Sequence, residues 1–238
     1  MLACHGITSN RMESVIDSSA STMRELTLNT DDFNAAVSKL MAGSKRDAVT
    51  VLKEQARGIL RNVIAVTPPG KWGRGSSEAR QKGQASVVSD VLKVVVPVAP
   101  AKAEEQDVAA LIKRYRRNGR VRKGANPRIT VPRDKLKDYL KRKKALVGFL
   151  ASGWNEAAAR LGVKPAAWIW KNEGPGAIRI DINATGIRII ATNEVRYAST
   201  ISQLRSRLQW AVNQQQRTIE RRLKRFQEDQ ARRAGFKT

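Results

Sequence analysis

Apolar residues recur at helical spacing in two segments near the start of the chain. The first follows residues 29–32, where a capping residue and two acids favour a helix N-terminus. The second stops at residues 67–70, because proline lacks an amide hydrogen and biases its predecessor away from helix. We predict two helices, with apolar positions Phe33, Val37, Leu40 and Met41 in the first and Leu52, Ala56, Ile59, Leu60 and Val63 in the second.

Three segments in the middle of the chain predict further helices. The first begins at Ser76, the second spans residues 104–117, and the third covers most of 134–158. Gly148 and Gly153 in the third would let another backbone come close, because glycine has no side chain. The packing side predicted for the first of these helices carries Ala85, Val88 and Leu92.

Strand periodicity is present late in the chain. Ile178, Ile180 and Ile182 alternate with polar residues, a turn follows at 183–186, and the alternation resumes at Ile187. This pattern predicts a β-hairpin. Since a hairpin cannot bury an apolar face alone, we expect it to pack on the helices or on strands of another subunit.

The C-terminal part of the chain predicts one long amphipathic helix, because its apolar residues are spaced by about three and four while its other faces are polar. Two tryptophans, Trp154 and Trp168, lie in another apolar stretch, so packing is the expected role of their rings. We predict that both sets form the core or a subunit interface. The helical stripe consists of Ile201, Leu204, Leu208, Val212, Ile219, Leu223 and Phe226.

The chain has a large excess of basic residues, which is concentrated in two segments. The 238 residues include 45 Lys and Arg against 21 Asp and Glu, a formal net charge of +24, and the 41% hydrophobic content is still enough for a core. Residues 113–144 hold fifteen basic and two acidic side chains, and residues 201–238 hold ten and three. Because salt screens exposed charges beyond about 8 Å, dense clusters attract a polyanion where scattered lysines do not.

The first basic cluster suits contact with phosphates, since arginine offers a planar fork of several donors. A solvated face that meets an acidic protein surface fits the same run, and the sequence does not choose between the two. Sequence-specific readout has no support, because the chain shows no zinc finger, basic zipper or aromatic RNA-binding signature. The candidate contact residues are Arg114, Arg116, Arg117, Arg120, Arg122, Lys123, Lys141, Arg142, Lys143 and Lys144.

The sequence predicts no catalytic residue, no cofactor site and no metal site. Cys4 and His5 are the single cysteine and the single histidine, which excludes four-ligand Cys/His zinc sites and paired-cysteine redox chemistry within one chain. A metal-dependent nuclease using Asp181 or Glu194 is a third hypothesis, which nothing in their spacing favours. No stretch approaches the ~20 apolar residues of a membrane helix, so we expect no membrane partner.

Several features follow one another along the chain: a helix end at residues 66–68, a basic segment rich in small residues, the stretch 147–155 (Val-Gly-Phe-Leu-Ala-Ser-Gly-Trp-Asn), a hairpin, Arg-Tyr-Ala at 196–198, and a terminal helix. In this order they resemble the tail-completion or head-tail joining proteins of the tailed-phage neck, over roughly residues 31–226. The chain departs from that pattern at 69–72, where many relatives carry a short Asp-Thr-Gly turn, and in a basic insert at about 101–144.

The resemblance implies an α+β fold, with long helices packed against a small antiparallel sheet and a long C-terminal helix. It implies one such domain over 30–238, which includes the insert. Residues 1–29, rich in Ser and Thr and without sustained periodicity, are predicted to form a flexible or partner-ordered arm.

The resemblance also implies a noncatalytic virion protein, made in the host cytoplasm and assembled as a homo-oligomeric ring between the portal or adaptor protein and the tail proteins. A closed ring repeats each basic cluster around its axis, where it would hold genomic DNA by phosphate attraction without reading bases. The alternative is a sequence-nonspecific nucleic-acid-binding accessory protein unrelated to virions.

Overall fold

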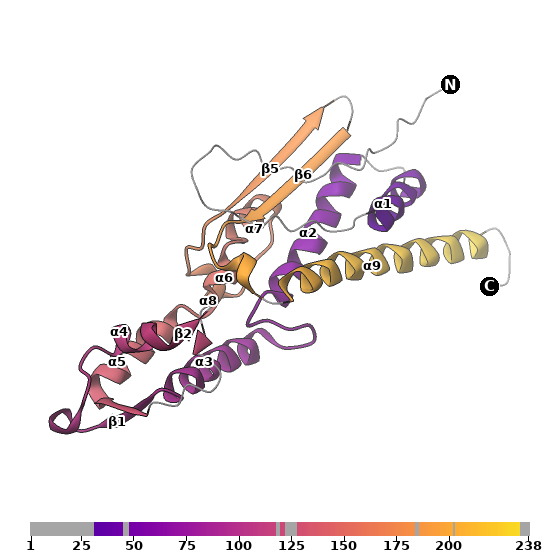
Figure 1. The fold of residues 1–238 in the computed structure, drawn as a ribbon. Coiled ribbons are helices and arrows are strands. Elements are labelled where there is room, and N and C mark those ends of the chain that lie inside the picture. Colours follow the sequence, from indigo (N-terminus) through magenta and orange to yellow (C-terminus); the bar gives the residue numbers. More distant parts are fainter. Residues whose placement is uncertain are drawn as a thin grey trace. The chain divides into compact units, whose positions relative to one another are not determined.

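The computed structural model describes most of the chain as two compact units (Figure 1). The predicted arm at 1–29 lies outside the described residues. The described ranges are 31–44, 48–117, 120–121, 128–183, 186–201 and 203–233. Unit 1 combines Met1–Thr67 with Leu150–Thr238, and unit 2 is Pro68–Phe149.

The single domain predicted over 30–238 is a coarser division of the chain than these two units. The predicted insert at about 101–144 falls inside unit 2, which begins earlier, at Pro68. The α+β class is confirmed, because long helices accompany a small antiparallel sheet and a long helix near the C-terminus.

Unit 1 is built around α1 (Asp31–Ser44), α2 (Ala48–Val66) and α9 (Leu204–Arg233), and α9 packs against both α1 and α2. The predicted start of α1 is confirmed, with Asp31 and Asp32 in its first turn. The predicted end of α2 is also confirmed, and Thr67 Oγ1 donates to the carbonyl oxygen of Val63 over 2.7 Å there.

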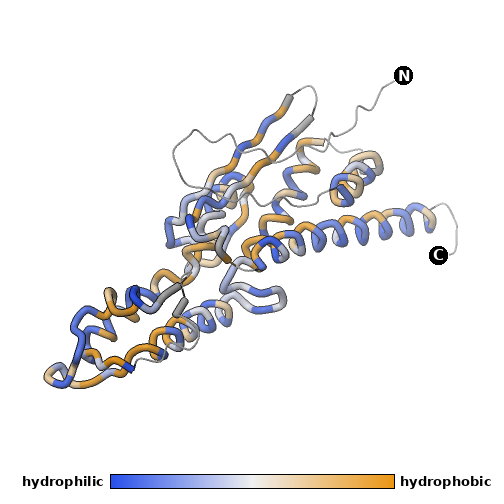
Figure 2. Tube along the Cα trace, in the orientation of Figure 1, coloured by the Kyte–Doolittle hydropathy of each residue, from blue (hydrophilic) through white to orange (hydrophobic). Residues whose placement is uncertain are grey.

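The predicted terminal helix is confirmed as well, although it begins at Leu204 and not at Ile201, because Gln203 adopts a positive φ of 65°. Hydrophilic residues dominate α9, and hydrophobic positions recur along its length (Figure 2). The recurring positions of α9 meet the stripe of α1 in one cluster. Its buried members are Phe33, Ala36, Val37, Val212 and Ile219.

A buried polar pair joins α2 to α9. Nε2 of Gln215 donates to Oε1 of Gln55 over 2.7 Å, and both side chains are buried. A Cβ on Gly58 would overlap the side chain of Gln215, so the glycine gives α9 its close approach to α2. Since a buried amide without a partner costs about 1–3 kcal/mol, the pair holds α9 in one register along α2.

The predicted hairpin is confirmed as β5 (Gly176–Asn183) and β6 (Gly186–Asn193), paired antiparallel from Gly176 opposite Asn193 to Asn183 opposite Gly186. It packs on helices, as expected: α7 (Asn155–Leu161) contacts β5, and α2 contacts β6. Arg57 Nε of α2 also donates to the carbonyl oxygen of Leu161, which ties α2 to the end of α7.

The segment predicted as mainly helical over 134–158 is divided in the structure. It forms α5 (Arg133–Ala145), α6 (Phe149–Ser152), which crosses the boundary between the units, and the start of α7. The break after α5 coincides with Gly148, whose φ of 102° is accessible chiefly to glycine. Between α7 and the hairpin lies α8 (Ala167–Trp170), and the short turn η2 (Ala198–Thr200) precedes α9.

At Gly153 the predicted close neighbour is a side chain, because a Cβ there would overlap Asn193; the close backbone contact is made at Gly176, where a Cβ would overlap the carbonyl oxygen of Gly153. We therefore expect Gly176→Ala to lower the free energy of unfolding by about 2 kcal/mol, since backbone must move to admit one methyl group. Urea unfolding followed by circular dichroism measures the change. The control is Gly75→Ala, at a φ of −60° with no heavy atom of the described chain within 4 Å of the new Cβ. Equal midpoints for the two variants would contradict this packing.

Unit 2 contains α3 (Ser76–Leu92), α4 (Val108–Tyr115) and α5, with short strands between them. β1 (Val95–Val98) pairs parallel with β4 (Ile129–Pro132), and β2 (Arg116–Arg117) pairs antiparallel with β3 (Arg120–Val121). The turn η1 (Pro100–Lys102) follows β1 and packs beside β4.

The outer edges of the β1–β4 pair offer few amide donors. The carbonyl oxygen of Val94 accepts from the amide of Ile129. Because the backbone N–H and C=O groups of alternate residues point to opposite edges of a strand, those of Val95 and Pro97 face away from β4. On β4, the outward carbonyl oxygen of Thr130 accepts from the amides that follow η1, at Glu104 and Glu105. Pro97 and Pro132 have no amide hydrogen to offer.

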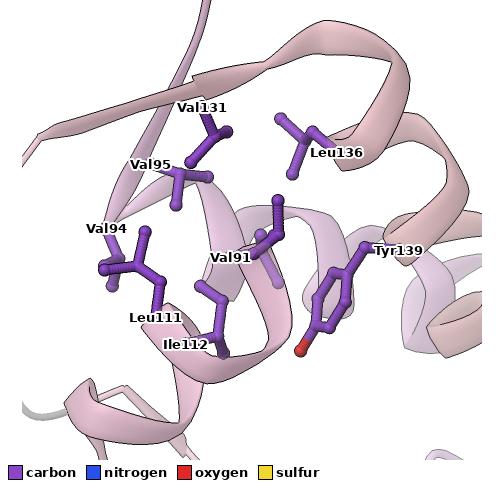
Figure 3. Packing of buried hydrophobic residues seen from close by; sticks show 9 residues of the cluster. Val91, Val94, Val95, Leu111, Ile112, Val131, Leu136 and Tyr139 are labelled. Atoms are coloured by element: carbon purple, nitrogen blue, oxygen red, sulfur yellow. The ribbon is translucent and has the colours of Figure 1, made fainter. Parts of the chain in front are cut away.

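The core of unit 2 is a cluster gathered from three helices and two strands (Figure 3). The packing side predicted for α3 is wrong: Ala85 is exposed and Leu92 is 46% exposed, while Ala79 and Val91 are buried. Val91 lies inward, in a cluster that it shares with residues of α4, β4 and α5. The cluster consists of Val91, Val94, Val95, Val108, Leu111, Ile112, Val131, Leu136 and Tyr139.

The helix predicted over 104–117 is shorter in the structure. Asp107 caps α4, because its Oδ1 accepts from the amides of Ala109 at 2.9 Å and Ala110 at 3.0 Å. At the other end, α4 stops at Tyr115, where the chain enters β2. The cap explains why helix begins at Val108 and not at Glu104.

Candidate basic interaction surface

The first part of the predicted basic cluster lies at the end of α4 and in β2 and β3. Arg114 is exposed in the last turn of α4, and its Nη1 lies 3.7 Å from Oε2 of Glu105. The backbones of Arg117 and Arg120 pair across β2 and β3, next to Arg116, but these three side chains lie outside the described part of the structure. Two predicted contact residues, Arg122 and Lys123, lie entirely outside it.

The second part of the predicted cluster lies on α5, which carries seven basic and two acidic side chains in 13 residues. Lys141 and Arg142 are exposed, and Lys143 and Lys144 are half-buried. Nζ of Lys143 lies 5.5 Å from the centroid of the Tyr139 ring, within cation–π range. The cations of the last turn also stabilise α5 through its dipole, so part of this charge serves the fold.

The apolar and the basic side chains of α5 lie on neighbouring sides of the helix. Leu136 and Tyr139 point into the core of unit 2. Next to them runs a row of cations spaced by four, four and three residues, which places them on one face of the helix. We name this row the cationic stripe; over eleven residue steps it is about 16 Å long. Its members are Arg133, Lys137, Lys141 and Lys144.

The cationic stripe borders a shallow hollow of about 480 Å³. Its apolar lining comes from Leu92 at the end of α3, Pro97 in β1, and Leu136 and Leu140 of α5. Sequence reasoning missed the hollow, because it assigned Leu92 to the packing side of α3. The spacing of the four cations on α5 was the available signal.

Comparisons with protein-family models, curated proteins and solved structures find no match for this chain. The likeness to tailed-phage neck proteins therefore rests on the order of sequence features. None of the described helices is long and apolar enough to cross a membrane.

The residues predicted for the core or a subunit interface lie at different depths in unit 1. Trp154 and Trp168 are buried, Leu223 packs partly buried against the α1–α9 cluster, and Ile201 is half-buried. Phe226 is 44% exposed near the distal end of α9. The buried members of the α9 stripe are Leu204, Leu208, Val212 and Ile219.

The basic side chains of α9 are mostly exposed. Arg207 is an exception, since its Nη1 donates to the carbonyl oxygen of Val66 over 3.1 Å and so satisfies the end of α2. The second predicted basic concentration thus combines one helix-capping arginine with a solvent-facing set. The exposed set is Arg205, Arg217, Arg221, Arg222, Lys224, Arg225 and Arg232.

The acidic residues considered for metal chemistry are in unit 1. Asp181 in β5 accepts from Nε of Arg179 over 2.8 Å, and Glu194 follows β6. Within the described ranges, no group of three or more His, Cys, Asp or Glu side chains gathers at one place. Partial burial raises the pKa of the Tyr197 phenol above its ordinary value.

Proposed function

We propose that the protein is a noncatalytic structural component of a tailed-phage virion, part of the head-tail connector ring between the portal or adaptor protein and the tail. One observation carries the proposal: the order of elements that resembles neck proteins. That order is a helix ending before Pro68, a basic segment, α6 and α7, the β5–β6 hairpin, the residues 196–198, and α9.

Exposed apolar side chains in unit 1 support assembly into a ring. Ile182 of the hairpin, Trp170 of α8 and Phe226 of α9 are large, hydrophobic and exposed in the single chain. A two-stranded sheet is marginal by itself, and contact with a neighbouring subunit would bury its exposed residues. A ring uses the same surface patches on every copy, so each such residue would stabilise every interface.

The net positive charge of the chain would allow such a ring to bind DNA. A net charge of +24 on each chain makes an assembly that attracts DNA without any base contact. The exposed cations of α9 and α5 are the described residues that would supply this attraction. The same observation favours the second candidate, a sequence-nonspecific nucleic-acid-binding accessory protein.

Deletion of the gene in its phage separates the two functions. A connector protein is needed to join heads to tails, so electron micrographs of the deletion lysate should show heads and tails apart, and a plasmid copy of the gene should restore joined particles. Quantitative mass spectrometry of purified particles should find a fixed number of copies, as a ring requires. Joined, infectious particles made without the gene would overturn the connector proposal and favour the accessory protein.

A further inference from the structure

We propose that the hollow beside α5 is a docking site for an acidic amphipathic helix of a partner protein. The proposal concerns unit 2 alone. It does not rest on the connector function, because the same surface would serve either of the functions considered above.

The apolar lining of the hollow, which we call its floor, favours an apolar occupant. Leu92 ends α3 and leaves 46% of its surface exposed, and it lies beside Pro97 and Leu140 in the lining. Apolar side chains that enter such a hollow remove hydrocarbon surface from water on both partners, which favours association.

The cationic stripe, which borders the floor, favours negative charge on the occupant beside its apolar side chains. Among the described residues, no ion pair is formed by Arg133, Lys137, Lys141 or Lys144. The acids of α5, Asp134 and Asp138, lie off the stripe on the neighbouring side of the helix. Carboxylates that flank an apolar stripe would therefore face cations that form no ion pair within the described part of the chain.

The shape of the surface suits a helix. The stripe is about 16 Å long, which corresponds to about three turns of a partner helix lying along α5. An amphipathic helix places apolar residues at spacings of three and four, and acids beside them would reach the stripe. A single amphipathic helix would thus supply apolar side chains for the hollow and carboxylates for the cationic stripe beside it.

The apolar floor is what distinguishes this occupant from nucleic acid. A phosphate backbone would contact the cationic stripe, but it has no apolar group to place against Leu92, Pro97 and Leu140. Base stacking uses aromatic side chains, and the lining of the hollow contains none. The observations therefore favour a protein helix.

The test uses the purified full-length chain and a fluorescein-labelled peptide of about 18 residues, long enough to form a helix on binding. Leucines at helical spacing form one face of the peptide, and glutamates flank them. A second peptide of the same composition has a scrambled order without the apolar face. Fluorescence anisotropy should show that the amphipathic peptide binds about tenfold more tightly than the scrambled one, because only the first can fill the hollow.

Paired charge reversals locate the binding. Lys137→Glu with Lys141→Glu should weaken peptide binding about tenfold, because the stripe then repels the glutamates. The matched control is Lys135→Glu with Arg142→Glu, which makes the same change of net charge on the other exposed side of α5 and should alter binding by less than about twofold.

A third variant tests the apolar floor. Leu92→Ser should weaken binding of the amphipathic peptide about fivefold and leave binding of a labelled DNA duplex of about 20 base pairs unchanged. Circular dichroism checks the fold of each variant, and Lys137→Gln with Lys141→Gln replaces the reversal if that pair unfolds the protein.

Three results would overturn the docking proposal. Equal losses in the stripe and control variants would mean that peptide binding is general electrostatic attraction. An unchanged affinity of Leu92→Ser for the peptide would remove the role of the floor. Binding of the duplex that depends on the stripe, with no preference between the two peptides, would identify a nucleic-acid surface. None of these results bears on the deletion phenotype that tests the connector function.

Discussion

Replacing Trp154 with alanine is expected to lower the free energy of unfolding by about 4 kcal/mol. The ring is 8% exposed, and its Nε1 donates to Oγ1 of Thr67 over 3.2 Å. Removal leaves a cavity beside α2 and takes away the donor that this buried hydroxyl accepts from. Urea unfolding followed by circular dichroism at the helix band measures the loss without relying on tryptophan fluorescence.

Two further substitutions separate the contributions at this position. Trp154→Phe keeps most of the ring volume and removes the hydrogen bond, so it should cost about 1–2 kcal/mol. Trp170→Ala is the matched control, because that ring is 50% exposed and its loss should cost less than about 1 kcal/mol. Similar midpoints for the two alanine variants would show that Trp154 is not the core residue that its burial indicates.

Leu111→Ala should have a comparable effect on unit 2, about 3 kcal/mol. Leu111 is 1% exposed at the centre of the cluster formed by α3, α4, α5, β1 and β4 (Figure 3). Alanine would leave a cavity that helices attached to paired strands cannot easily close. Native-state hydrogen exchange of the α4 amides reports the loss within unit 2, since they exchange faster when this unit opens more often.

The control for Leu111 is a leucine that lies outside the cluster. Leu92→Ala removes the same atoms from the 46% exposed side chain at the end of α3, so it should cost less than about 1 kcal/mol. If the two variants accelerate exchange equally, Leu92 belongs to the core, and the floor of the hollow has been assigned wrongly.

The elements predicted well from sequence are those whose pattern is local. The stripes of α1, α2 and α9 repeat over several turns, and the alternation on either side of the hairpin turn sets its register. In these segments each residue's spacing from its neighbours already determines which face is apolar.

The parts that sequence reasoning missed depend on contacts between distant segments. β1 and β4 pair in parallel with Val95 opposite Ile129, and parallel strands have no turn between them to mark the pairing. The packing side of α3 was predicted wrongly for a related reason, because the elements that cover Val91 come later in the chain.

The candidate surface divides in the same way. The basic clusters follow from residue counts, and the cationic stripe follows from spacings within one helix. The hollow requires Leu92 and Pro97 beside α5, which only tertiary packing provides.

The prolines of the β1–β4 pair have a consequence for contacts between separate molecules of the protein. Pro97 and Pro132 have no amide hydrogen to offer on the outward sides of the two strands. The outward carbonyl oxygen of Thr130 already accepts from the amides of Glu104 and Glu105. An incoming strand from a neighbouring molecule would find fewer amide donors at either side than a regular strand offers. The prolines therefore disfavour the joining of β1–β4 pairs from separate molecules into a longer sheet.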